Sequence, residues 1–515
     1  MPIPKLPIAH PESKPDLNNP IVSSLLIAIV CISVIATRYI FIPTTDIAWL
    51  TYAAEQLIKG KKFGADIYEL NTPFAILLYA PSVLISRLFS ISPFLVTYTL
   101  TTLCIIGCLN VSSKILRYRE YPLFKENLNI NVFRFSFLCA YLLLPGLNGF
   151  SQRDHLISAL LLPYALIKLS PSGFKEHPTE HKYSLNLLSA LLLAISLLIK
   201  PQYCFYIFII NLFSALKYKK IRLFKPGIYL SSLILVLGIL SVIVYFADWL
   251  PLARDALVTY PGYRHDRTIL FLHFIKIYYI PLAFIAILKD LLPKDHKKNF
   301  LLTFFCISTF AIPGLFIFGN GWYYHLLPIM LPLWGIAFFS IIYHLSHQKK
   351  YIFSGFIIII LILNGYFLSQ QSKNFYLVPL PKETFTTLQT GDSFLCISSD
   401  PQCAFPLTTI KGYQYASRYP SLWPTAGAKN LLKKGKLDKN TFLHYFNNDA
   451  KNLSDDIKKH APKTIVIQWD QKPDGTIEDF SDSSIFLDAL RPYTLLKKEN
   501  FTPDYSTWIY VKKSS

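Results

Sequence analysis

Asp46 is the residue with the clearest potential for chemistry. It follows the apolar stretch 21–42 by a few residues, in the segment FIPTTDIAWLTYAAEQLIKG. A carboxylate in such a place can act as a general base that removes a proton from a hydroxyl group. Asp is also a favoured N-cap, so the TTD triplet could instead cap the helix that begins there. Both interpretations are carried to the structure.

Basic residues next to other apolar stretches form a second group. We expect four of them to bind one anionic ligand together: Arg153, Lys200, Arg264 and Arg267. Arg recognises anionic oxygens through a bidentate fork, whereas Lys acts as a point charge. The alternative is that they anchor helix ends by snorkelling to the membrane surface.

Other polar and aromatic residues gather in the same loops. The secondary acidic candidates are Asp66, Glu69 and Asp154, and the candidates for ligand binding are His155, Gln202, Trp322, Tyr323, Tyr324 and His325. The acids with His155 would allow a divalent metal, but their spacing is not compact and no cofactor is required. The sequence contains no glycine-rich phosphate loop and no nucleophile elbow.

The elements that must position these residues are membrane helices. Of the 515 residues, 52% are hydrophobic, and they form runs of the length that crosses a bilayer as a helix. The predicted spans are 21–42, 91–113, 134–150, 155–169, 184–199, 203–217, 227–247, 270–290, 299–318, 325–345 and 351–369. The predicted fold class is therefore an all-α polytopic bundle of about eleven spans.

The basic loops set the predicted orientation. The net charge of +20 would suggest nucleic-acid binding in a soluble protein, but here the basic residues lie mainly in short loops between apolar runs. We exclude 71–90 from the spans and expect it to lie at the outer interface, since counting it would move the basic loop 114–133 out of the cytoplasm. The segment 1–20 is then cytoplasmic, 21–369 is the membrane domain with outer elements at 43–90, and the chain ends outside.

The last part of the chain, 370–515, reads as a soluble α/β domain. Short runs rich in β-branched and aromatic residues occur at 393–398, 463–469 and 506–512, with polar helical stretches between them. Cys396 and Cys403 lie seven apart there, and an oxidising compartment would permit a disulfide between them. Two unpaired thiols are the alternative, and the other six cysteines are expected to be packing residues.

The segment 46–73 resembles the first outer loop of the GT-C glycosyltransferases, which include the lipid A aminoarabinose transferases and the protein O-mannosyltransferases. The resemblance rests on Asp46 after the first span, the helix AWLTYAAEQLIKG, a polar link and the Pro-containing TPFAILLYAPSVLISRLF. It extends more weakly to QRDHL and GWYYHLLP. The sequence departs from the common pattern at Ile47, where a second acid often stands, and at Thr72, where many members have proline.

This resemblance implies a transferase that uses a polyprenyl-phosphate sugar and an acceptor on the outer face of a bacterial inner membrane. Asp46 would deprotonate the acceptor in a single inverting displacement. The basic residues and His325 would bind the lipid phosphate, and the C-terminal domain would be periplasmic. A transporter or flippase of lipid-linked saccharides is the alternative, although transporters usually place charges near the bilayer midplane and show repeated halves.

Overall fold

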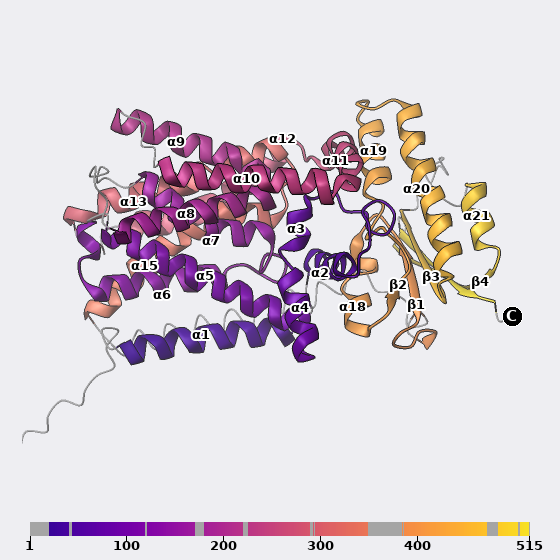
Figure 1. Ribbon diagram of the computed structural model, residues 1–515, viewed down its shortest axis with the longest axis horizontal. Coiled ribbons are helices and arrows are strands. Elements are labelled where there is room, and N and C mark those ends of the chain that lie inside the picture. Colours follow the sequence, from indigo (N-terminus) through magenta and orange to yellow (C-terminus); the bar gives the residue numbers. More distant parts are fainter. Residues whose placement is uncertain are drawn as a thin grey trace, which may run out of the picture.

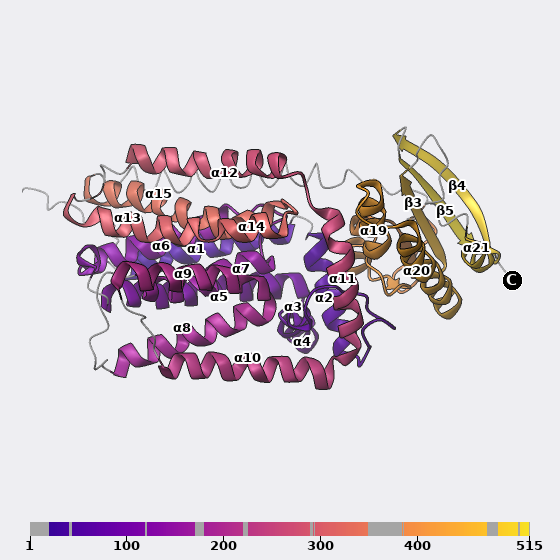
Figure 2. The ribbon, with the colours of Figure 1, turned by 90° about the horizontal axis from the view of Figure 1, so that it is seen from above.

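A computed structural model describes residues 20–40, 44–118, 121–169, 180–219, 225–288, 292, 294–348, 384, 386–470, 483–502 and 505–513. The molecule is elongated, with a long helical bundle at one end and a smaller α/β domain at the other (Figures 1 and 2). The predicted span 351–369, the segment 1–19 and much of the basic loops lie outside the described residues.

The bundle consists of helices that run along the long axis of the molecule (Figure 2). They are α1 (Pro20–Ile40), α5 (Pro93–Tyr118), α6 (Asn127–Leu143), α7 (Arg153–Leu169), α8 (Glu180–Ile199), α9 (Cys204–Tyr218), α10 (Lys225–Tyr245), α12 (Arg267–Leu288), α13 (Lys294–Thr309), α14 (Ile312–Phe318) and α15 (Leu327–Gln348). Within the described residues, five helical stretches are long and apolar enough to cross a membrane. The chain is thus a polytopic membrane protein, and the number of spans stays a prediction.

One predicted span has wrong boundaries, and another, whose residues 299–316 are long and apolar enough to cross a membrane, contains a turn. The span predicted at 134–150 is displaced, because α6 already ends at Leu143 and is followed by Pro145 and Gly146, which do not continue a helix. The span predicted at 299–318 is interrupted by a turn at 310–311 between α13 and α14, just before Pro313.

Short helices cover the end of the bundle that faces the α/β domain (Figure 1). They are α2 (Thr45–Ile58), α3 (Pro73–Leu77), α4 (Ala80–Phe89) and α11 (Leu250–Thr259). The segment 71–90 forms α3 and α4, of 5 and 10 residues, and neither is long enough to cross a bilayer.

The α/β domain is built on one five-stranded sheet with the order β2-β1-β3-β5-β4. The strands are β1 (Ser393–Ile397), β2 (Gln414–Tyr415), β3 (Thr464–Asp470), β4 (Tyr493–Thr502) and β5 (Tyr505–Lys512), and the helices are α18 (Leu407–Lys411), α19 (Trp423–Lys433), α20 (Lys439–His460) and α21 (Ser484–Leu490). β1 pairs in parallel with β2 and β3, and β5 pairs antiparallel with β3 and β4. The three predicted strands coincide with β1, β3 and β5, whereas β2 and β4 were not predicted.

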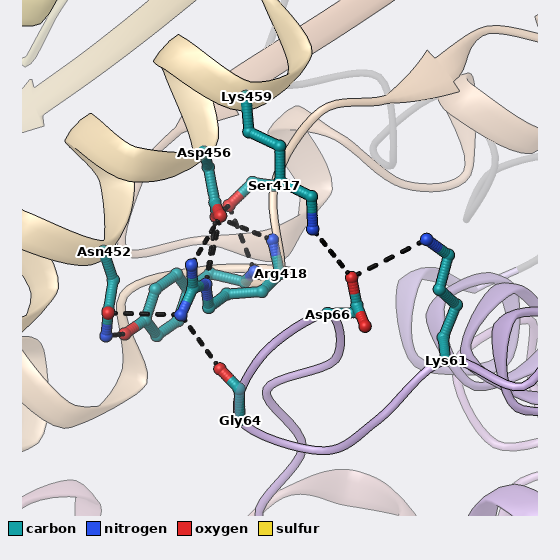
Figure 3. A network of polar contacts seen from close by, with 9 residues as sticks. Lys61, Gly64, Asp66, Ser417, Arg418, Asn452, Asp456 and Lys459 are labelled. Atoms are coloured by element: carbon teal, nitrogen blue, oxygen red, sulfur yellow. Dashed lines mark hydrogen bonds and ion pairs between the residues drawn. The ribbon is translucent and has the colours of Figure 1, made fainter.

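Arg418 joins this domain to the loop after α2 (Figure 3). Its guanidinium pairs with Asp456 of α20 at 2.8 Å and donates to the Gly64 carbonyl at 3.0 Å. Its own carbonyl accepts from the Tyr68 amide at 2.7 Å, and nearby Lys459 pairs with Asp66 at 3.0 Å. These contacts fix the α/β domain over the loop after α2.

Candidate active site

A cavity of about 450 Å³ lies where the bundle, the α2 loop and the α/β domain meet. Its polar lining comes from Thr44, Thr45, Asp46, Glu69, Asn71, Asn148, Gln152, Arg153, Ser399, Asp400 and Gln402. Its aromatic lining comes from Trp49, Tyr260, Tyr263, Trp322, Tyr323, Tyr324 and Trp423. Its volume and its mixture of aromatic walls with a few polar groups are typical of a small-ligand site.

Asp46 lies in the first turn of α2 and does not cap the helix. The N-cap is Thr44, whose hydroxyl accepts from the Ile47 amide at 3.5 Å. Asp46 Oδ2 accepts a hydrogen bond from Gln152 Nε2 at 3.1 Å and lies 3.9 Å from Arg153 Nη2. Oδ1 has no hydrogen-bond partner among the described residues, and the side chain is 28% exposed. The carboxylate is therefore held in place with one oxygen left for a ligand.

Arg153 is the first residue of α7 and is only 5% exposed. Within the described structure, its Nε and Nη1 atoms have no hydrogen-bond partner. A buried charge with unmade hydrogen bonds costs several kcal/mol unless a ligand supplies the partners. Arg153 is thus the strongest candidate for an anion-binding residue in the cavity.

Glu69 forms part of the cavity wall through two well-defined contacts. Its Oε2 accepts from Trp49 Nε1 at 2.6 Å, and its Oε1 accepts from the Asn71 amide at 2.7 Å. Because both oxygens are occupied, Glu69 is better suited to orient Trp49 than to exchange protons.

Lys200 and Asp154 pair with each other instead of facing the cavity. Lys200 Nζ donates to Asp154 Oδ2, and Tyr203 donates to Asp154 Oδ1 at 2.7 Å. Asp154, with Gln202 and His325, lines a separate space of about 30 Å³. Lys200, Gln202 and His325 do not line the large cavity. The charge of Lys200 is already neutralised by Asp154 and is not available to a ligand there.

Four further predicted site residues also lie outside the cavity. His155 is fully buried, with its Nδ1 accepting from the Ser151 amide at 3.1 Å and its Nε2 2.7 Å from the Tyr141 carbonyl, so both ring nitrogens are used in the core. Asp66 is held by Lys459 on the domain surface. Arg264 and Arg267 are exposed at the start of α12. None of these four residues lines the large cavity.

The three aromatic residues predicted at 322–324 do line the cavity, and they join aromatic residues that the sequence analysis missed. Trp322 packs edge-on against Tyr260 at 5.9 Å and against Trp423 at 6.4 Å between ring centroids. Tyr260 and Tyr263 belong to the motif YPGY, whose density of aromatic residues beside predicted site residues was a usable signal. Trp423 lies 160 residues after Tyr263, and nothing local in the sequence marks it.

Asp400 is an acidic residue of the cavity that the sequence analysis missed. It is half-buried at the cavity wall, and its Oδ1 accepts from the Gln402 amide at 2.9 Å. Burial raises the pKa of Asp400, the hydrogen bond from Gln402 opposes this, and the negative charge of Asp46 adds to the rise. Among the described residues no group of three His, Cys, Asp or Glu side chains is arranged to hold a metal ion.

Arg38 supports the site from within the bundle. It is 1% exposed at the end of α1, donates to the Pro145 carbonyl at 2.6 Å and lies over the Phe150 ring at 4.3 Å. These contacts hold the loop that leads from α6 to Gln152 and Arg153.

The arrangement of a membrane bundle with a cavity at one end, closed by an α/β domain, is similar to that of solved GT-C structures. The solved structures that match include ArnT from Cupriavidus metallidurans in the apo state, with 12% identity, a TM-score of 0.52 and coverage of 94% of this chain and 97% of that one. ArnT from the same organism bound to undecaprenyl phosphate matches with the same identity and TM-score, over 96% and 98%. The resemblance inferred from the first outer loop is thereby confirmed at the level of the fold. No protein-family model and no curated protein sequence matches the chain.

Proposed function

We propose that this protein is a membrane glycosyltransferase that moves a sugar from a polyprenyl-phosphate carrier to a hydroxyl-bearing acceptor on the outer side of the membrane. The observation that carries the proposal is the buried guanidinium of Arg153, with unpaired N–H groups, beside the partly free carboxylate of Asp46. The fold shared with ArnT, of which one structure holds undecaprenyl phosphate, supports a lipid phosphate as the anion.

Each cavity residue would have a separate role in the transfer reaction. The acceptor oxygen would attack the anomeric carbon of the sugar while the bond from that carbon to the phosphate oxygen breaks, with inversion. Asp46 would take the proton of the acceptor, and Arg153 would stabilise the charge that develops on the departing lipid phosphate. The aromatic rings, with Trp322 central among them, would bind the sugar face. None of these steps requires a metal.

We place the protein in a bacterial inner membrane, with its N-terminus in the cytoplasm and residues 370–515 in the periplasm. The sorting of basic loops supports this orientation. The alternative is a flippase for lipid-linked saccharides, which would bind the same carrier without breaking a bond.

The test is mass spectrometry of lipids that co-purify with the protein, followed by reconstitution with that lipid carrying a radiolabelled sugar. Movement of the label from the lipid to a second molecule supports the transferase. A bound polyprenyl-phosphate sugar whose label crosses the membrane without leaving the carrier would support the flippase.

A further inference from the structure

A short loop of the α/β domain forms one wall of the cavity and is closed at its base by a disulfide. Cys396 of β1 and Cys403 are bonded, with their Cα atoms 6.0 Å apart, and Ser399 to Gln402 between them line the cavity. This is the pair that the sequence analysis selected. The disulfide limits the positions that the loop can adopt, because both of its ends are tied to the same point of the sheet.

The loop is also packed on the helix that carries Asp46. Phe405, directly after the loop, contacts Trp49 at 5.3 Å and Tyr52 at 5.4 Å between ring centroids. Both aromatic partners belong to α2, whose first turn holds Asp46. The position of the loop relative to Asp46 is therefore set by a buried aromatic cluster as well as by the disulfide.

Asp400 presents an unused hydrogen-bond acceptor in this wall. Its Oδ1 is occupied by the Gln402 amide, while Oδ2 has no hydrogen-bond partner among the described residues. Asp46 on α2 likewise has one free oxygen. Two carboxylates from different segments thus line one cavity, and each can accept a hydrogen bond from the same polyhydroxylated ligand.

Two opposite charges line the cavity on different domains, Arg153 on the bundle and Asp400 on the α/β domain. Arg153 enters from α7 of the bundle, where a lipid phosphate would arrive from the bilayer, whereas Asp400 enters from the α/β domain. A phosphate would be repelled by Asp400 and attracted by Arg153. An inverting displacement requires the attacking and leaving groups on opposite faces of the sugar. The acceptor would therefore approach from the wall that carries Asp400, within reach of Asp46, while the phosphate would bind the free N–H groups of Arg153.

Building on the proposed function, we propose that the loop Cys396–Cys403 is the acceptor-binding wall and that Asp400 accepts a hydrogen bond from a saccharide acceptor beside Asp46. Aromatic faces combined with carboxylates that accept from hydroxyls are suited to a sugar. Asp400 takes no proton in the reaction, because the attacking hydroxyl gives its proton to Asp46. The acceptor would be a glycan or the sugar part of a glycolipid.

The experiment compares Asp400→Asn with the unchanged protein, in full length and in detergent. Asn keeps the turn by accepting from the Gln402 amide through its side-chain oxygen, but it replaces the free Oδ2 acceptor by a donor. Asp392→Asn is the matched control, since Asp392 lies in the same domain, paired with Lys463 at 2.8 Å and away from the cavity. The measurements are the affinity for undecaprenyl phosphate, and the KM values for the labelled donor and for an envelope extract separated into lipid and aqueous fractions.

We expect Asp400→Asn to raise the KM for the acceptor fraction about ten-fold, the loss of one hydrogen bond to a charged group. Its affinity for undecaprenyl phosphate and its KM for the donor should stay within two-fold, and Asp392→Asn should be unchanged in all three. The lipid and aqueous fractions distinguish a glycolipid from a soluble glycan. The double variant Cys396→Ser, Cys403→Ser should shift the acceptor KM in the same direction.

Three results would overturn this assignment. They are an unchanged acceptor KM in Asp400→Asn, a rise confined to the donor KM, and label recovered on protein. Failure of the proposed function itself looks different, because the unchanged protein would then bind no undecaprenyl phosphate or would transfer no label to any fraction.

Discussion

Arg153 Nη2 lies 3.9 Å from Asp46 Oδ2, at the meeting point of α7 and α2. The distance is longer than a hydrogen bond, so the two charges attract each other without saturating one another. Arg153 thus helps to hold the Asp46 carboxylate in place while its Nε and Nη1 atoms stay available for a ligand.

Asp46→Asn tests the general base. Asn cannot accept the acceptor's proton, so transfer should fall by about two to four orders of magnitude. Binding of undecaprenyl phosphate should persist, since Arg153 is retained and Thr44 still caps α2. Asp488→Asn, which changes an exposed acid of α21 paired with Arg491, should transfer normally. An active Asp46→Asn variant would remove Asp46 from the mechanism.

Arg153→Ala tests the phosphate site. Loss of one charge-assisted contact typically costs about 1.5–3 kcal/mol, or roughly a ten-fold to hundred-fold weaker affinity for undecaprenyl phosphate. Arg264→Ala is the control, because Arg264 is exposed and outside the cavity. Equal affinities for the two variants in a titration followed by tryptophan fluorescence would contradict the assignment.

Gly262→Ala tests the contact between the segment after α11 and the α/β domain. A Cβ at Gly262 would lie 2.1 Å from the Gly427 carbonyl oxygen, so backbone must move. We expect faster hydrogen exchange in α19 and loss of transfer, because Tyr263 and Trp423 would separate at the cavity wall. Gly435→Ser is the matched control for exchange in this region, since no heavy atom lies within 4 Å of a Cβ built there, although its positive φ adds some local strain. Unchanged exchange in α19 of Gly262→Ala would contradict the close packing.

The raised pKa of Asp449 predicts how the free energy of unfolding depends on pH. Burial raises its pKa to about 6, while hydrogen bonds from Thr425 and Tyr419 oppose the rise. The folded state thus binds a proton that the unfolded state releases near its ordinary pKa of about 3.9. The contribution of Asp449 to the free energy of unfolding is fully present below about pH 3.9. It is lost as the pH rises to about 6, and the loss is up to about 3 kcal/mol. Denaturant unfolding at pH 4 and pH 7 should show this difference, and Asp449→Asn should reduce it.

Thiol labelling tests the orientation. In a Cys204→Ser background, Lys61→Cys should react with a membrane-impermeant reagent in whole cells, because residue 61 is exposed in the loop after α2. Lys114→Cys, exposed near the far end of α5, should react only after the membrane is opened. Equal labelling of both would show that the assigned sides are wrong.

The sequence was sufficient to predict a site residue where that residue lies directly at the end of one apolar stretch. Asp46 and Arg153 directly follow or begin apolar stretches, so hydropathy alone brings them to one face of the membrane. Hydropathy does not specify the direction of a side chain, which is why Arg264 and Arg267 were grouped with Arg153 although they are exposed. Nor does it reveal that Lys200 is neutralised by Asp154, since that pair depends on how α7 and α8 pack.

The remaining cavity residues were missed because long-range contacts bring them to the site. Asp400 and Trp423 reach the cavity only because Arg418, Phe405 and Gly427 dock the α/β domain on the outer loop. No periodic pattern connects residues 350 positions apart. The disulfide was predictable because both cysteines lie in one short segment that turns at Pro401.

The wall that contains Asp400 and Trp423 has a consequence for biosynthesis. The residues of the bundle that line the cavity, up to Tyr324, leave the ribosome well before residues 400 and 423 do. A growing chain whose bundle is already in the membrane therefore still lacks one side of the cavity. Synthesis itself would delay completion of the cavity until the α/β domain has been made and has docked on the bundle.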